Sequence, residues 1–136
     1  MVLVDANVVL DVVTADPVWL KWSQGELARL ATSGLAINPI IYAELAPAFR
    51  TEAELAEALK DWPLQRLALP YEAAWPAARA FAEYRRRGGA RTSPLPDFYI
   101  GAHAEVEGHT LLTRDAARYR TYFPSVPLIC PAETVR

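Results

Sequence analysis

Residues 1–8 read Met-Val-Leu-Val-Asp-Ala-Asn-Val, and this stretch decides the class of fold. The apolar run from Met1 to Val4 contains two valines and predicts a short buried strand. Asp5 ends the run at once. In an open parallel sheet, ligands bind beyond the carboxyl ends of the strands. A carboxylate directly after a buried strand is therefore the first candidate for a functional residue.

Strands and helices alternate along the rest of the chain. Further strands are predicted over residues 35–37, 64–69, 110–113 and 126–129. Helices are predicted over residues 16–33, 51–63, 72–87, 97–108 and 115–122, and another begins at residue 38. This alternation favours an α/β sandwich around a parallel sheet. We expect a single domain over residues 1–136, because the chain is short and contains neither repeats nor low-complexity linkers.

Composition excludes several classes of protein. Hydrophobic residues make up 52% and charged residues 22% of the chain, which is typical of a globular domain. The net charge of −2 excludes a uniformly basic nucleic-acid-binding coat but leaves room for a local basic patch. The single cysteine, Cys130, cannot form an internal disulfide. No stretch approaches the roughly 20 apolar residues of a membrane span, and the first apolar run lacks the basic leader of a signal peptide. We therefore expect a cytoplasmic protein without membrane contact.

Four carboxylates fall near the expected carboxyl edge of the sheet. Asp5 ends the first strand, and Asp115 follows the fourth. Asp97 begins the helix before that fourth strand, and Glu44 lies one or two turns into the helix after the second strand. If the strand order is 3-2-1-4-5, the first and fourth strands are neighbours. Asp5 and Asp115 then face each other across one crevice, with Glu44 and Asp97 on its walls.

Such a group of acids predicts a site for a hard divalent cation. Four carboxylates repel one another unless a cation compensates them or some are protonated. Mg²⁺ and Mn²⁺ prefer oxygen ligands, and a bound ion of this kind activates water and stabilises charge on a phosphodiester. The lack of clustered histidine or cysteine argues against zinc. Each acid also has a structural explanation: Asp5 caps the turn after the strand, Asp97 and Asp115 cap helices, and Glu44 is a solvated helix residue.

Four motifs in order carry a resemblance to a known family. They are Val4-Asp-Ala-Asn-Val8, Tyr42-Ala-Glu-Leu45, the segment from Arg91 to Ala104 that contains Asp97, and Leu111-Leu-Thr-Arg-Asp115 with Tyr119 and Phe123-Pro124. With these motifs the chain resembles the PIN-domain ribonucleases, particularly the VapC toxins of bacterial and archaeal toxin–antitoxin pairs. Ala6 departs from the pattern, because that family usually has threonine or serine there. The change removes a hydroxyl near the expected metal site.

The resemblance implies both a fold and an activity. The implied fold is a three-layer α/β/α PIN-like sandwich, whose five-stranded, mostly parallel sheet has the order 3-2-1-4-5 and helices on both faces. The implied activity is that of a metal-dependent endoribonuclease, which hydrolyses RNA phosphodiester bonds as the toxin of a type II toxin–antitoxin system. The implied cofactor is Mg²⁺, or alternatively Mn²⁺. The implied partners are the RNA substrate, a cognate antitoxin and a second copy of the chain in a homodimer.

The resemblance also implies roles for individual residues. The implied metal ligands are Asp5, Glu44, Asp97 and Asp115. By the same resemblance Asn7 orients a carboxylate or the substrate, Thr113 places a hydroxyl beside the metal, and Ser93 positions the loop before the helix at residue 97. Simpler explanations are a turn residue for Asn7, a β-branched strand residue for Thr113 and a plain loop residue for Ser93.

Several further residues have a structural explanation that competes with a functional one. Arg85, Arg86 and Arg87, with Arg91 nearby, form the one dense cationic cluster, which is either a solvated helix end or a site for RNA phosphates. His103 and His109 are isolated in the sequence, and we expect both to be structural. We expect Cys130 to be packed in the core.

The helix over residues 16–33 carries a tryptophan outside its expected apolar face. Leu20, Leu27 and Ala31 lie within about 40° of one another on a helical wheel and predict the buried face. Trp22 lies roughly 140° from Leu27, among polar residues. We hypothesise that Trp22 anchors an antitoxin segment, whose arginine or lysine reaches the acidic pocket. The alternative is that Trp22 packs beneath a neighbouring loop.

Three competing functions are less favoured. A haloacid-dehalogenase-like phosphatase needs a second aspartate two residues after Asp5, where Asn7 stands. A response-regulator receiver needs a lysine after its fifth strand, but the lysines of this chain are Lys21 and Lys60. The remaining alternative is a catalytically poor PIN-like protein-interaction module, and the four intact acids count against it.

Overall fold

A computed structural model of the chain describes residues 1–92 and 95–132. Ser93, which the resemblance placed before the third acidic residue, lies outside the described residues. Within the described part of the chain, no helix is long and apolar enough to cross a membrane.

The sheet has five parallel strands in the order β3-β2-β1-β4-β5, which confirms the predicted fold class. The strands are β1 (Val2–Val4), β2 (Leu35–Ile37), β3 (Leu64–Arg66), β4 (Thr110–Leu112) and β5 (Leu128–Ile129). β1 is the central strand, paired with β2 on one side and with β4 on the other. All residues of β1 and β2 are buried, as expected for short apolar strands with helices on both faces.

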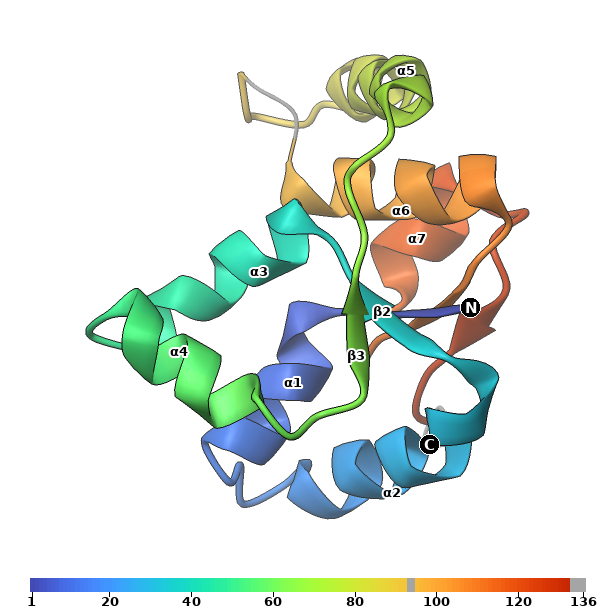
Figure 1. Cartoon of the computed structure of the whole chain (residues 1–136). Helices are drawn as coiled ribbons and strands as arrows, with labels where there is room; N and C mark the ends of the chain where they lie inside the picture. The colour runs from blue at the N-terminus through green and yellow to red at the C-terminus, as the bar shows by residue number, and fades with distance from the viewer. Residues whose placement is uncertain (93–94, 133–136) are drawn as a thin grey trace.

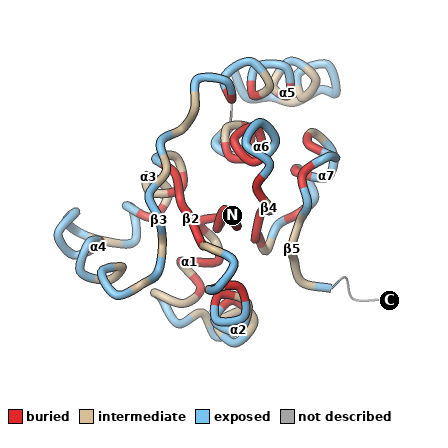
Figure 2. Tube along the Cα trace, turned by 45° about the vertical axis from the view of Figure 1, so that its right-hand side comes forward, coloured by how far each residue is buried: buried red, intermediate tan, exposed pale blue. Residues whose placement is uncertain are grey.

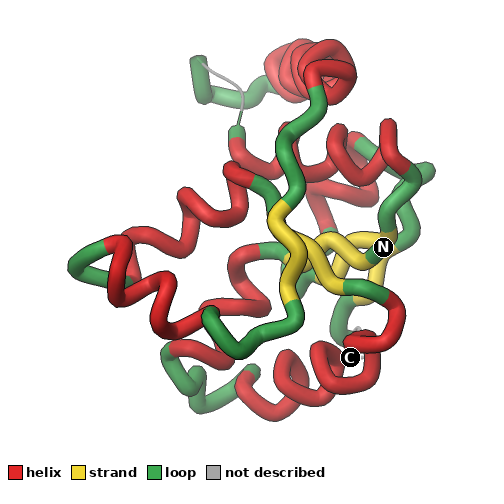
Figure 3. Tube along the Cα trace, in the orientation of Figure 1, coloured by secondary structure: helices red, strands yellow, loops and turns green. Residues whose placement is uncertain are grey.

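The helices cover both faces of the sheet, so the molecule has three layers (Figures 1 and 2). On one face lie α1 (Ala6–Val13) and α2 (Leu20–Leu30). On the other lie α5 (Ala74–Arg86), α6 (Pro96–Glu107) and α7 (Ala117–Tyr122), with α6 next to the sheet and α5 packed on α6. The strands form the centre of the molecule and the helices surround them (Figure 3).

Two more helices follow β2 and lie to one side of the sheet. They are α3 (Pro39–Leu45) and α4 (Glu52–Leu59). Asn38 caps α3 by accepting a hydrogen bond from the backbone N–H of Ile41, and Thr51 caps α4 by accepting from that of Glu54. α3 contacts both α1 and α6, so it joins the two helical layers beside the sheet.

Helix α1 is the element that sequence reasoning missed. Its residues 6–13 are rich in valine, which has a modest helix propensity and suits strands better. In the structure Asp5 accepts a hydrogen bond from the backbone N–H of Ala6 and so caps the helix. Val8 and Val9 are fully buried in the core. Tertiary packing of this valine face therefore outweighs its local preference.

The prediction for α2 is wrong at its start and in part at its buried face. Asp16 accepts hydrogen bonds from the backbone N–H groups of Val18 and Trp19, which forms a turn before the helix begins at Leu20. The buried residues of α2 are Ser23, Leu27 and Leu30, whereas Leu20 and Ala31 are only partly buried. Trp22 is also partly buried and packs against the core, so it does not lie on a polar face.

All strands except β2 are shorter than predicted, and for β5 this changes the position of Cys130. β5 ends at Ile129, so Cys130 lies after the strand and is only partly buried. Its Sγ lies 3.2 Å from Nη2 of Arg120. The prediction that Cys130 is packed in the core is therefore wrong.

Candidate active site

The four predicted acids line one pocket at the carboxyl edge of the sheet. This cavity, of about 200 Å³, is lined by Asp5, Ala6, Asn7, Leu10, Glu44, Asp97 and Asp115. Asp5 directly follows β1, Asp115 follows β4, and these two strands are neighbours. Glu44 reaches the pocket from α3, and Asp97 reaches it from the first turn of α6. The structure thus brings together all four residues that the sequence singled out.

Asp5 is a buried carboxylate that faces three hydrogen-bond donors of neighbouring residues. Its Oδ1 accepts from the backbone N–H of Ala6 at 2.8 Å, and its Oδ2 accepts from the Thr113 hydroxyl at 2.8 Å and from the Tyr119 hydroxyl at 3.0 Å. Burial, together with the nearby charge of Asp97, nonetheless raises the pKa of Asp5 to about 6. Asp5 therefore lines the acidic pocket and also acts as a cap, although the element that it caps is helix α1 and not the expected turn.

Glu44 has an oxygen that the rest of the described structure leaves without a partner. Its Oε1 is buried and has no hydrogen-bond partner. Burial, and then the charges of Asp5 and Asp97, raise the pKa of Glu44 to about 7. A solvated helix residue would show neither property, so that explanation of Glu44 is wrong.

Asp97 and Asp115 do not act as helix caps. The N-cap of α6 is Leu95, and Asp97 lies within the first turn, where its charge suits the helix dipole. The N-cap of α7 is Ala116, whereas Asp115 is an exposed residue in the connection from β4. The structural explanation of these two aspartates as caps is therefore wrong.

Thr113 and Asn7 connect the acids through hydrogen bonds. The Thr113 hydroxyl donates to Asp5 and accepts from the backbone N–H of Asp115 at 3.1 Å. Asn7 donates from Nδ2 to the Thr113 hydroxyl at 3.3 Å and accepts at Oδ1 from the backbone N–H of Arg114 at 3.1 Å. Both side chains thus hold the connection after β4 against the start of α1. Asn7 belongs to that helix, so its explanation as a turn residue is wrong.

Tyr119 and Arg118, on α7, are residues of the site to which sequence reasoning gave no role. The Tyr119 hydroxyl lies 3.0 Å from Oδ2 of Asp5 and 3.2 Å from Oδ1 of Asp97. Burial and the two acidic charges raise the pKa of Tyr119 well above its usual value, so the phenol keeps its proton. Arg118 pairs with Asp97, at 3.1 Å from Nη1 to Oδ2. The only sequence signal was that Tyr119 belongs to the fourth motif.

A second missed feature is an ion pair between a buried carboxylate and a partly exposed arginine. Asp11 on α1 is 2% exposed and accepts from Nε and Nη2 of Arg114 at 2.8 and 2.9 Å. It also accepts from the Ser23 hydroxyl of α2 at 2.7 Å. This network joins α1 and α2 to the residue immediately before Asp115.

The arginine cluster at the end of α5 makes contacts within its own region. Arg86 and Arg87 both pair with Glu83, and Arg85 donates to the backbone carbonyl groups of Gly89 and Arg91. These contacts fit the interpretation as a helix end. None of these arginines is among the residues that line the acidic pocket.

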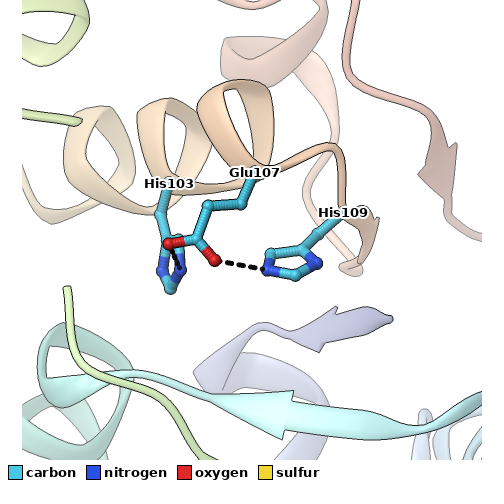
Figure 4. Close-up of side chains that lie close together, drawn as sticks. All are labelled: His103, Glu107 and His109. Atoms are coloured by element: carbon cyan, nitrogen blue, oxygen red, sulfur yellow. Dashed lines mark hydrogen bonds and ion pairs between the residues drawn. The ribbon is translucent and has the colours of Figure 1, made fainter. Parts of the chain in front are cut away.

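His103 and His109 flank the Glu107 carboxylate (Figure 4). His103 Nε2 lies 3.6 Å from Oε1 of Glu107, and His109 Nε2 lies 3.2 Å from Oε2. Asn38 directs its Nδ2 donor at Nδ1 of His103, 3.0 Å away, because its Oδ1 already accepts from the Ile41 N–H. The neutral His103 ring therefore carries its proton on Nε2, facing Glu107. This arrangement leaves Nε2 no lone pair for a metal ion and agrees with a structural role.

The pocket, in contrast, fits a divalent cation. Its donors are carboxylate oxygens, which hard cations prefer, and Oε1 of Glu44 is buried without a partner. Burial first, and the charges of neighbouring acids second, raise the pKa values of Asp5 and Glu44, so the pocket disfavours their ionised forms unless a cation compensates them. A bound cation would relieve this repulsion.

The fold is a parallel α/β sandwich, and its four acids gather beyond β1 and β4, where the strand order reverses. Open α/β sheets bind their ligands at this position, so the protein belongs to the class with an acidic binding site there. The PIN domain family matches residues 2–124 of the chain. The chain therefore belongs to the PIN domain family, whose members are in general nucleases that use divalent metal ions. No curated protein matches the chain.

Solved structures with the same fold come from several bacteria. VapBC2 from Rickettsia felis, bound to a DNA fragment from its promoter, is similar at a TM-score of 0.74 and 19% identity, covering 97% of this chain and 100% of that one. FitAcB from Neisseria gonorrhoeae is similar at a TM-score of 0.71 and 21% identity, and the match covers 94% of this chain and 96% of that one. DNA-bound VapBC from Salmonella typhimurium is similar at a TM-score of 0.71 and 22% identity, and the match covers 95% of this chain and 96% of that one. At these identities the likeness shows the fold alone.

Proposed function

We propose that this chain is a metal-dependent endoribonuclease that hydrolyses RNA phosphodiester bonds as the toxin of a type II toxin–antitoxin pair. The observation that carries the proposal is the acidic pocket, in which Glu44 has a buried oxygen without a partner and a pKa raised to about 7. Membership of the PIN family supports nuclease chemistry. The similarity in fold to VapBC2 and to FitAcB supports the toxin assignment.

In this proposal Asp5, Glu44, Asp97 and Asp115 hold Mg²⁺ or Mn²⁺. When bound, such an ion lowers the pKa of a water molecule and stabilises charge on the phosphodiester oxygens. Thr113 and Tyr119 orient the Asp5 carboxylate by donating to it, and Asn7 holds the connection that carries Asp115. Glu44 releases its proton on metal binding, because a ligand carboxylate must be ionised.

The test of this activity is cleavage of RNA by the purified chain without a partner. We expect cleavage with Mg²⁺ or Mn²⁺ and none with EDTA. Asp97→Asn should lower the rate by several orders of magnitude and leave the fold intact. Glu105→Gln, which changes an exposed carboxylate on the same helix, is the matched control and should keep the wild-type rate. Full activity of Asp97→Asn would refute the assignment.

For the antitoxin, the structure offers an apolar groove between α2 and the start of β3. The groove has a volume of about 310 Å³ and is lined by Val12, Gln24, Leu27, Ala28, Ala31, Leu35, Asp61, Trp62 and Pro63. We propose that an apolar helical segment of the antitoxin docks there. This site replaces Trp22 as the expected anchor, because Trp22 packs against the core. Ala28→Glu should weaken antitoxin binding and leave RNA cleavage unchanged, whereas an unchanged antitoxin affinity would refute this location.

For the homodimer, the structure offers two exposed aromatic side chains. Tyr71, in the 3₁₀ turn just before α5, is 93% exposed, and Trp75, in the first turn of α5, is 73% exposed. Large aromatic side chains of this kind are enriched in interfaces. We propose that a second copy of the chain covers them. Sedimentation at tens of micromolar should show a dimer that Trp75→Glu dissociates, and a monomeric wild-type protein would refute the proposal.

A further inference from the structure

Helix α7 brings a cation to the rim of the acidic pocket. Nη1 of Arg118 lies 3.1 Å from Oδ2 of Asp97, and its guanidinium lies 6.0 Å from the ring centroid of Phe98. The side chains of this pair are 40% and 26% exposed. The described residues that line the pocket itself include no cation. Arg118 therefore places a partly exposed cation in direct contact with one of the four acids.

Both oxygens of Asp97 are occupied by side chains of α7. Arg118 holds Oδ2, and Oδ1 lies 3.2 Å from the Tyr119 hydroxyl, whose single proton is shared between Asp97 and Asp5. The two contacts differ in how easily they break. Tyr119 is 1% exposed and is also held by Asp5, whereas Arg118 is partly exposed at the end of a long side chain. An ion pair of this exposure contributes at most about 1 kcal/mol, so a competing charge can displace it.

We propose that Arg118 is an RNA-phosphate-binding residue that Asp97 holds in place until a divalent cation takes over the Asp97 carboxylate. The inference rests on the proposed function. Once released, the guanidinium stays within reach of the pocket, because Arg118 lies on α7 next to Tyr119, whose hydroxyl contacts Asp5 and Asp97. Its planar donors suit a phosphate, with which arginine forms short charge-assisted hydrogen bonds. In this proposal Arg118 has two roles. It compensates the charge of Asp97 when no metal ion is bound, and it attracts RNA when a metal ion is bound.

A double-mutant cycle tests this exchange without metal and without cleavage. The probe is a fluorescent single-stranded RNA oligonucleotide, and its affinity is measured in EDTA for the wild type, Arg118→Ala, Asp97→Asn and the double variant. In the wild type Asp97 holds Arg118, so Arg118→Ala should change the affinity less than about twofold. In Asp97→Asn the guanidinium is free, so removing it should weaken binding roughly tenfold and lower the slope of log K against log salt by about 0.7.

Two further variants separate this role from general electrostatics and from a brace for Asp97. Arg29→Ala removes an arginine from another exposed ion pair, with Glu26, away from the pocket, and should have the same small effect in both backgrounds. Arg118→Lys in the Asp97→Asn background should retain most of the salt slope. Calorimetric titration of Mn²⁺ without RNA should give a severalfold tighter affinity in Arg118→Ala, because a competitor for Asp97 is gone.

Equal effects of Arg118→Ala in both backgrounds would overturn the proposal, as would weaker Mn²⁺ binding, which would make Arg118 a brace for Asp97. Circular dichroism and urea denaturation would confirm that each variant folds. A wild-type protein that fails to cleave RNA with Mg²⁺ or Mn²⁺ would count against the proposed function, whereas the cycle in EDTA reports on Arg118 alone. The two failures are therefore distinguishable.

Discussion

Replacing Glu44 with glutamine should stabilise the metal-free protein at alkaline pH and have little effect at acidic pH. The folded state raises the pKa of Glu44 from 4.5 to about 7, through burial and the charges of Asp5 and Asp97. A carboxyl whose pKa is raised by folding favours the folded state least when it is ionised. The loss of folding stability that comes from ionised Glu44 is absent below pH 4.5, grows as the pH rises and is complete above pH 7.

The size of the effect follows from the shift and from the position of Glu44. One pKa unit corresponds to about 1.4 kcal/mol, so the full shift sets an upper bound of about 3 kcal/mol. Glu44 is only half-buried, and its repulsion is shared with Asp5, so water screening and coupling reduce the gain. We expect Glu44→Gln to raise the free energy of unfolding by about 2 kcal/mol at pH 8. Glutamine keeps the shape of the side chain and removes the charge.

Urea denaturation in EDTA at pH 5 and pH 8 measures this difference. Glu105→Gln is the control, because it removes an exposed carboxylate from α6 outside the pocket. Mn²⁺ at pH 8 should stabilise the wild type and should stabilise Glu44→Gln much less, because the variant lacks one anionic ligand. A stability difference of equal size at both pH values would refute the reasoning, since it would not come from the ionisation of Glu44.

Two other predictions concern the packing that supports the pocket. Asp11→Ala should lower the free energy of unfolding by about 2 kcal/mol in urea denaturation, because it leaves the buried Ser23 hydroxyl and the partly exposed Arg114 without their shared acceptor. A loss under about 0.5 kcal/mol would show that water replaces this acceptor. Gly101→Ala should lower the free energy of unfolding by about 1–3 kcal/mol, because the added Cβ would lie 2.3 Å from the Phe123 ring. Ala78→Gly, at an exposed helical position on α5, is a control that should lower it by no more than about 1 kcal/mol.

The strands and the acids that follow them could be predicted because they depend on local sequence, whereas the strand order was implied by the family resemblance. Short apolar runs that end at once in a polar residue define β1 and β4 and place Asp5 and Asp115 at one edge. The strand order then makes them neighbours. Helix α1 could not be predicted in this way, because its valines favour a strand locally and become helical through burial of Val8 and Val9.

The charge environment of the pocket could not be predicted, because it depends on side chains that are distant in sequence. Asp11 and Arg114 are 103 residues apart, and Asp5 and Tyr119 are 114 residues apart. No period or spacing in the sequence indicates that these side chains meet. The same limitation affected Trp22, since a helical wheel gives the angle between residues but not which face the neighbouring layer covers.

Ala6 shows how these distant contacts alter the meaning of a local departure from the family pattern. Lack of a hydroxyl at position 6 would matter most if Asp5 depended on it for a hydrogen bond. Asp5 already accepts from the Ala6 backbone N–H and from the hydroxyls of Thr113 and Tyr119. The donors that orient this carboxylate thus come from the end of β4 and from α7. Alanine at position 6 therefore leaves the orientation of Asp5 intact, and Thr113 and Tyr119 are the positions at which the loss of a hydroxyl should disturb it.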